Sequence, residues 1–191
     1  MPITAAAYNP RGRPKTGSTE VLVIPGVALV SGLGTLAPGA NLLYYFPIQV
    51  EAALRVTGLL CEITTLQAGQ NIRVGLYNCD ENLQPTSLIV DGGNLSTGAT
   101  GVVEAAVDVT LQPGRYLIAF NCSHGTPAVR FARGGTNLMG YVSGLGSNLM
   151  RSELTIASAF GALASTGVAW TSTGGFSSPP PYFVFLRASY G

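Results

Sequence analysis

Charged residues are scarce in this chain. Asp, Glu, Lys and Arg make up 10% of its 191 residues, whereas an ordinary soluble domain contains about 25%. The composition is not that of a membrane protein either, because 25 glycines and 12 prolines interrupt the apolar stretches. We expect a β-rich fold whose exterior carries Ser, Thr, Asn and Gly and packs against copies of itself or a larger assembly. This composition favours a structural or binding role.

The chain also has almost no net charge and almost no lysine. Its formal charge is +1, so no long-range field draws it to nucleic acid or to anionic lipid. Lys15 is the only lysine, and arginine prefers planar, bidentate partners in half-buried contacts. The basic residues form no clustered stripe apart from Arg11, Arg13 and Lys15. We therefore expect no nucleic-acid partner.

Cysteine is too sparse for a disulfide framework or a zinc site. Cys61, Cys79 and Cys122 are an odd number and have neither CxxC nor zinc-ligand spacing. Cys61 and Cys122 lie inside apolar strand patterns, which predicts buried, reduced thiols and assembly in a cytoplasm. A disulfide has no support from the sequence.

Targeting and membrane-spanning segments are not expected. The first eight residues have neither a basic region nor an apolar region, as a signal peptide would. Residues 21–50 contain no charge, but Pro25, Pro38 and Pro47 break any helix of about 18 residues. We expect no membrane insertion.

Helical periodicity is absent, and two-residue alternation replaces it. In the clearest case, Ile72, Val74 and Leu76 alternate with Arg73 and Gly75. Short strands at regular spacing, with turn signals between them, predict an all-β fold of the antiparallel β-sandwich or barrel type. The expected strands cover residues 21–24, 42–46, 51–65, 72–77, 86–90, 103–109, 115–121, 128–131 and 182–186.

Four local signals give sharper expectations. Pro47 is expected to close the strand before it, and residues 91–93, Asp-Gly-Gly, to end another. The apolar phase changes at Gly58, which predicts a β-bulge. Residues 112–114, Gln-Pro-Gly, have the arrangement of a type II turn.

Two regions are expected along the chain. Residues 1–40 read as an extended N-terminal arm with a short strand, and residues 41–191 as the sandwich domain. Pro2, Pro10 and Pro14 prevent regular structure at the start of the arm. Two interpretations of this arm stay open: a disordered tail, or a peptide that anchors the chain by ordering on an acidic neighbour.

No catalytic or metal-binding constellation emerges from the sequence. His124, the only histidine, could be written as a triad with Ser123 and either Asp91 or Asp108, but no G-x-S-x-G motif supports a nucleophile. Residues 78–82 gather oxygen ligands without the pattern of an EF-hand, and an ordinary polar turn is expected there. We expect no enzyme activity, no cofactor and no metal ion.

A glycan-binding surface is harder to dismiss. Such surfaces stack a sugar on an aromatic ring and bind its hydroxyl groups with amides, carboxylates or guanidinium groups. Trp170 could equally fill the end of the sandwich, so no binding residue is assigned. The candidates are Tyr141, Trp170, Phe176, Tyr182, Asn137, Asn148 and Arg133.

Several runs together resemble a module of tailed-bacteriophage structural proteins. They are Tyr44-Tyr45-Phe46-Pro47, residues 54–57 (LRVT), 72–77 (IRVGLY), 111–116 (LQPGRY) and a closing strand in 179–187 after prolines. The similarity covers about residues 42–187. It implies a jelly-roll-like β-sandwich on a virion, as a tail fibre or spike, a head fibre or a capsid decoration protein, assembled as a homotrimer and without a fixed catalytic motif.

The chain departs from a full tail fibre because it has no long repetitive shaft. This departure favours a small accessory protein on the virion, made in the host cytoplasm and bound to capsid or tail proteins through its arm. The alternative, from another functional class, is a lectin-like protein that binds a host-surface glycan for attachment.

Overall fold

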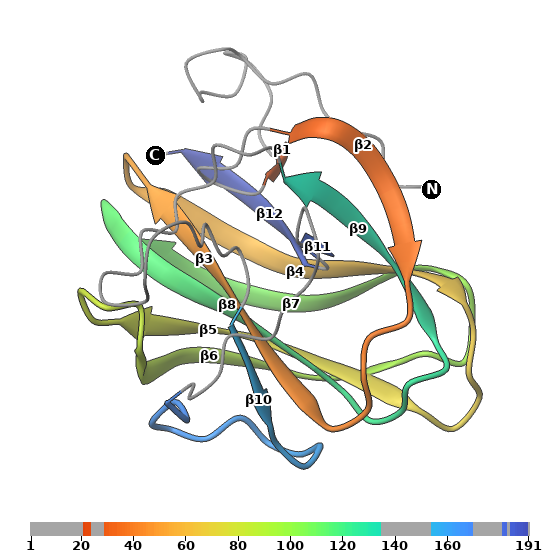
Figure 1. Cartoon of the computed structure of the whole chain (residues 1–191). Coiled ribbons are helices and arrows are strands. Elements are labelled where there is room, and N and C mark those ends of the chain that lie inside the picture. The colour runs from red at the N-terminus through yellow and green to blue at the C-terminus, as the bar shows by residue number, and fades with distance from the viewer. Residues whose placement is uncertain (1–20, 24–28, 135–153, 170–180, 183, 191) are drawn as a thin grey trace.

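The chain folds into strands alone wherever the structure describes it. The computed structural model describes residues 21–23, 29–134, 154–169, 181–182 and 184–190, and no helix occurs among them (Figure 1). The strands are β1 (Val21–Val23), β2 (Leu29–Leu36), β3 (Leu42–Val50), β4 (Leu54–Thr65), β5 (Asn71–Cys79), β6 (Pro85–Ser96), β7 (Gly101–Leu111), β8 (Gly114–Cys122), β9 (Ala128–Gly134), β10 (Leu154–Ala157), β11 (Pro181–Tyr182) and β12 (Phe185–Tyr190).

Eight of these strands form one long antiparallel ribbon that is rolled up. The pairs are nested: β5 pairs with β6, β4 with β7, β3 with β8 and β2 with β9. Pairing of β8 with β5 and of β9 with β4 rolls the ribbon into two packed sheets, ordered β3-β8-β5-β6 and β2-β9-β4-β7. This is the topology of a jelly roll, and the predicted antiparallel, jelly-roll-like β-sandwich is confirmed.

The remaining strands extend the two sheets. β10 pairs with β3 and completes a five-stranded sheet, while β1, β11 and β12 belong to the seven-stranded sheet. β12 lies between β1 and β4, so the terminal strand is inserted in a sheet, as expected. The single strand predicted over residues 182–186 is instead two strands: β11 pairs with β9, and β12 with β4.

The space between the sheets holds the main core. Alternate residues of each central strand point into it. The Tyr44 ring stacks on that of Phe46 at a centroid distance of 6.3 Å and meets that of Phe120 edge to face at 6.0 Å. Burial of each such large apolar side chain stabilises the fold by about 1.5–3 kcal/mol. Cys61 and Cys122 lie in this core, fully buried and with free thiols, as predicted.

Two of the expected strand ends are wrong. β3 continues through Pro47 to Val50, and a proline is tolerated there because β10 pairs only with residues 42–45 of that edge.

β6 continues through residues 91–93, where the register with β5 shifts and Gly93 adopts φ +75°. The Asp-Gly-Gly sequence therefore forms a bulge inside a strand, since glycine takes this backbone conformation without a steric penalty.

The predicted type II turn is also wrong. Gly114 does not have the positive φ that the third position of such a turn requires. The Gln-Pro-Gly link instead carries the chain from β7 in one sheet to β8 in the other. The Tyr116 hydroxyl donates a hydrogen bond of 2.9 Å to the Gln112 carbonyl and braces this crossing.

The sandwich begins earlier in the chain than the expected boundary at residue 40. β1 and β2 lie within residues 1–40 and pair with β12 and β9 of the seven-stranded sheet. Residues 1–20, the rest of the expected arm, lie outside the described residues.

The bulge predicted at Gly58 is confirmed. The register of β4 shifts between Val56 and Gly58 against β7, and it shifts at the same place against β12. An ion pair between Arg187 and Glu104 crosses this point, and a Cβ atom on residue 58 would overlap with Glu104 Oε1. Gly58 therefore leaves room for the charged pair above it, while its own backbone has no positive φ that would demand glycine.

We expect Gly58→Ala to destabilise the protein by about 1 kcal/mol, because the new methyl group displaces the Glu104 carboxylate from Arg187. In a Glu104→Ala background the same substitution should be neutral or stabilising, since alanine lowers the entropy of the unfolded chain. A double-mutant cycle by urea denaturation measures this coupling. Additive effects of the two substitutions would contradict it.

Candidate functional site

The outer face of the five-stranded sheet is covered by the chain itself. Strands β3, β5 and β8 present a second apolar layer on this face, and residues 158–169, here called the strap, follow β10 and pass over it (Figure 1). Leu163 is the strap residue that packs into the layer. The other buried members are Leu43, Tyr45, Tyr77, Leu83, Leu117 and Ala119.

Hydrogen bonds fasten the strap at both edges of this sheet. Next to β3, the N–H groups of Ser158 and Phe160 donate to the backbone and side-chain oxygens of Asn41, at 2.9 and 3.1 Å. Next to β6, the backbone of residues 165–167 forms two hydrogen bonds of 2.9 and 2.7 Å with the strand. The strap therefore behaves as an additional layer of the sandwich.

Asp91 connects the strap to the sheet. Its carboxylate accepts hydrogen bonds from the Arg73 guanidinium at 2.7–3.0 Å, from Gly93 N–H at 2.9 Å and from Leu163 N–H at 3.1 Å. Burial opposes ionisation of Asp91, but these hydrogen bonds outweigh it and hold its pKa below the ordinary value. One half-buried carboxylate thus joins β5, the β6 bulge and the strap.

The fit between strap and sheet is close. A Cβ atom on Gly75 would overlap with Leu163 Cδ1 and lie 2.7 Å from the Val90 carbonyl oxygen. Tyr77 donates a hydrogen bond of 2.7 Å to the Ala164 carbonyl, and its ring meets that of Tyr45 edge to face at 5.7 Å.

Neither of these two tyrosines is suited to acid–base chemistry near neutral pH. Burial, with a smaller effect from the Asp91 charge, raises the pKa of Tyr77 to about 12. Burial and the neighbouring Tyr77 raise the pKa of Tyr45 further above its ordinary value. Both phenols remain protonated, and their role in this layer is packing.

The outer face of the seven-stranded sheet carries charge in pairs. Three arginines each make two hydrogen bonds to a carboxylate on another strand, a geometry that lysine cannot provide. The pairs are Arg55–Asp108 (2.8 Å), Arg187–Glu104 (2.7 Å) and Arg130–Glu62 (2.9 Å). The Arg130 guanidinium covers Glu62, whose side chain is only 8% exposed.

Strand β7 leaves one part of this face open to solvent. Its inward residues pack on the core, whereas all five outward residues are exposed. These residues are small or already paired with an arginine: Val102, Glu104, Ala106, Asp108 and Thr110. Of the two broad outer faces, one is therefore covered by the strap and the other is open over β7.

The residues considered for a catalytic triad are not brought together. The Ser123 hydroxyl bonds to Gln70 and to the backbone of Asn71. The His124 Nδ1 atom bonds to Thr126. Asp91 and Asp108 are bound by Arg73 and Arg55, so no Ser–His–Asp arrangement forms among these residues.

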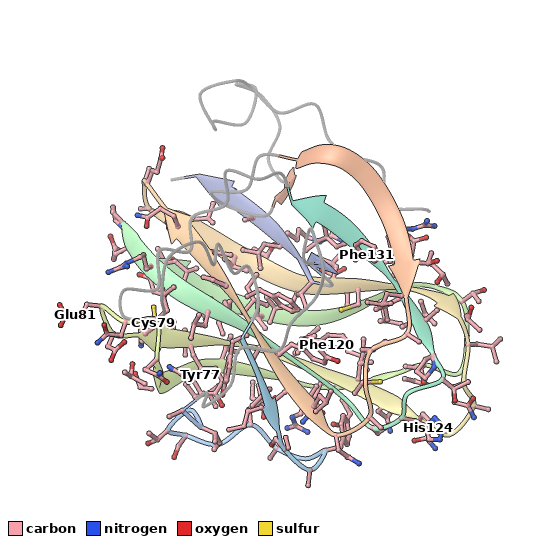
Figure 2. All side chains as sticks on the ribbon, viewed as in Figure 1. Tyr77, Cys79, Glu81, Phe120, His124 and Phe131 are labelled. Carbon is pink, nitrogen blue, oxygen red and sulfur yellow. The ribbon has the colours of Figure 1, made fainter. Side chains whose placement is uncertain are left out.

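The oxygen-rich loop at residues 78–82 is a self-contained turn. Asp80 Oδ1 accepts hydrogen bonds of 2.8 Å from the N–H groups of both Asn82 and Gln84. Within the described part of the chain, no group of three potential metal ligands occurs. Figure 2 places this loop, marked by Cys79 and Glu81, at the opposite end of the sandwich from His124.

Most of the glycan candidates lie outside the described residues. This holds for Tyr141, Trp170, Phe176, Asn137 and Asn148. Arg133 and Tyr182 fall on the paired strands β9 and β11, at adjacent register positions. Cross-strand partners share a face and successive residues alternate, so the register places Arg133 and Tyr182 on opposite faces of the sheet and does not join them in one site.

Comparison with models of known protein families, with curated proteins and with solved structures finds no match to this chain. Among the described residues, no helix is long and apolar enough to cross a membrane.

We expect Asp91→Asn to lower the free energy of unfolding by about 2 kcal/mol at pH 7, because the half-buried Arg73 loses its counter-charge and the strap loses an ionic acceptor. Asp108→Asn is the matched control: it breaks the same bidentate geometry at an exposed site and should change stability little. Urea denaturation of both variants measures the difference. Equal losses would contradict a structural role for Asp91 beyond that of a surface pair.

The contribution of Asp91 also depends on pH. Because its pKa is lower in the folded than in the unfolded state, its stabilisation is fully present above the unfolded value, about 3.9. It is lost as the pH falls through the folded value. Denaturation between pH 7 and pH 2.5 should therefore show the difference between wild type and Asp91→Asn shrinking at the acid end.

Proposed function

We propose that this chain is a structural protein of a bacteriophage virion, displayed on the particle surface as a homo-oligomer and anchored through its N-terminal arm. It would be an accessory protein, such as a capsid decoration protein, a head fibre or a tail-fibre-type protein. The jelly roll is a fold that capsid and lectin domains share. Fold alone does not identify a function, so the proposal depends on the surface described above.

The observation that carries the proposal is how the chain uses its few charges. Four arginine–carboxylate pairs hold four of the seven acids among the described side chains, which leaves an exterior of mainly uncharged groups. Such an exterior interacts weakly with water and gains by packing against protein neighbours. A subunit of a larger assembly meets this condition.

The positions of the resemblance motifs agree with this proposal. The aromatic-proline run lies in β3, residues 54–57 begin β4, residues 72–77 lie in β5, and residues 111–116 carry the chain from β7 into β8. These four segments lie in the inner strand pairs of the rolled ribbon, whereas the closing run in 179–187 overlaps β11 and β12, which lie outside it.

The arrangement of the chain ends favours anchoring by the arm. In β1, Val21 pairs with Ala188 of β12, and β1 is the first strand in the order of the seven-stranded sheet. The strand that follows residues 1–20 in the chain therefore lies at the margin of that sheet. Extended segments in such positions bind partners by adding a strand or through charged side chains.

Deletion of residues 1–20 tests the anchoring role. The truncated protein should remain a folded oligomer, because every described strand is retained, but it should no longer incorporate into particles. Sedimentation and co-purification with virions measure the two properties separately. Incorporation at the wild-type level would refute anchoring by the arm, and a monomer of 19.7 kDa for the intact chain would refute the homo-oligomer.

A lectin-like attachment role is the second candidate, favoured by the position of Tyr182 on β11, the last strand in the order of the seven-stranded sheet. A glycan array with the purified full chain distinguishes the two. Specific binding that Tyr182→Ala abolishes, with the oligomer intact, would support attachment. Absence of binding to every glycan on the array would leave the purely structural role.

A further inference from the structure

We propose that a second copy of this chain packs on the outer face of the seven-stranded sheet, over the exposed strand β7 and the adjoining side chains of Arg55 and Arg187, around a twofold axis. This inference rests on the proposed homo-oligomer and names the surface that forms it. The occupant is identified from the charge distribution of the face, which is complementary to itself.

The open face is divided into a negative and a positive half. Its exposed acids, Glu104 and Asp108, both stand on β7 at one side, whereas Glu62 on β4 is buried beneath Arg130. The arginines that pair with them, Arg55 and Arg187, stand on β4 and β12 further into the sheet. Each arginine reaches across a strand boundary to its acid, so the face has a line of carboxylates beside a line of guanidinium groups.

A twofold axis parallel to the strands places these lines in register. When one copy is rotated by 180° about such an axis, its β7 lies over β4 and β12 of the other copy. Each carboxylate line then faces a guanidinium line, and the same contact occurs twice, as an isologous interface requires. No pair of like-charged lines is brought together.

The Asp108 carboxylate can accept further hydrogen bonds from a second copy. Each oxygen of Asp108 accepts one hydrogen bond from Arg55, at 2.8 and 2.9 Å, whereas a carboxylate accommodates about four. Both side chains are well exposed, at 66% and 57%. Two such pairs from two copies would form a ring of four alternating charges that keeps the pairing within each chain.

Uncharged groups between the charges would supply the apolar contact. Val102 and Ala106 are exposed on β7 and carry no charge. The charged ring would fix the orientation of the two copies and add little to their affinity, because exposed ion pairs stabilise little. A twofold contact also implies an even-numbered assembly, unlike the homotrimer that the resemblance implies.

Complementary charge reversal tests the contact directly. Asp108→Arg gives a face with arginine in both lines, and Arg55→Asp gives one with carboxylates in both. Each variant alone should associate at least tenfold more weakly than wild type, because both cross-copy contacts between positions 55 and 108 are then repulsive. An equimolar mixture should recover wild-type association, since each copy then faces the opposite charge. Sedimentation of each variant and of the mixture measures this.

A second pair of variants tests the same contact without altering Asp108 or Arg55. Ala106→Arg places a long charged side chain at the centre of the face, and Ala68→Arg makes the same substitution in an exposed loop outside it. Ala106→Arg should shift the assembly toward the single-chain mass of 19.7 kDa, and Ala68→Arg should not. Circular dichroism confirms that both variants fold.

The outcomes separate this inference from the proposed function. Wild-type association of Asp108→Arg, Arg55→Asp and Ala106→Arg, or a trimer as the wild-type species, would overturn the twofold contact even if the protein incorporates into virions. Failure of the intact protein to incorporate into any particle would overturn the virion role even if the mixed variants associate.

Discussion

Each central strand must bury one apolar side in the single space between the two sheets, and the rest of the structure depends on this burial. The nested pairs bring together segments far apart in the chain, such as β2 with β9 and β3 with β8. No hairpin of this ribbon encloses a core by itself, because an isolated antiparallel pair leaves its apolar side in water. The β3–β8 pair already places Tyr44 beside Phe120, but only the rolled ribbon encloses these rings in one cluster with residues of the other sheet, such as Leu59. The nested topology is therefore the arrangement that closes the core.

The inner faces of both sheets are buried in the core, but the outer face of one sheet is covered by the chain and that of the other is exposed. The five-stranded sheet is apolar on its outer face as well, and the chain covers it with the strap, held through Asp91 and anchored by Leu163. The seven-stranded sheet has long side chains on its outer face, and arginine–carboxylate pairs neutralise it. A chain with so little charge cannot hydrate both faces, so one becomes an internal layer and the other a neutral surface.

The sequence predicted the features that are set by neighbouring residues within the same strand. Alternation identified β5 and β7, and the phase change identified the bulge at Gly58. It failed where the outcome depends on a partner strand. Pro47 is tolerated because of where β10 ends, and residues 91–93 form a bulge because β5 continues beside them. The short strand β10 and the strap carry no periodic signal of their own, so the covered face, and with it the role of Asp91, could not be predicted.

The arginine pairs explain why so few charges suffice and why they are arginine. A strand whose outward residues are small and neutral fits its neighbour almost equally well after a slip of two residues, since two is the period of the side chains. A bidentate pair between strands resists such a slip, because its planar geometry is satisfied in one register only. Arg55–Asp108 fixes β4 against β7, Arg187–Glu104 ties β12 to β7 across the Gly58 bulge, and Arg130–Glu62 fixes β9 against β4. Each pair thus adds a register constraint on the outer face to the one that the buried apolar residues supply on the inner face, and a single flexible ammonium group would add a weaker one.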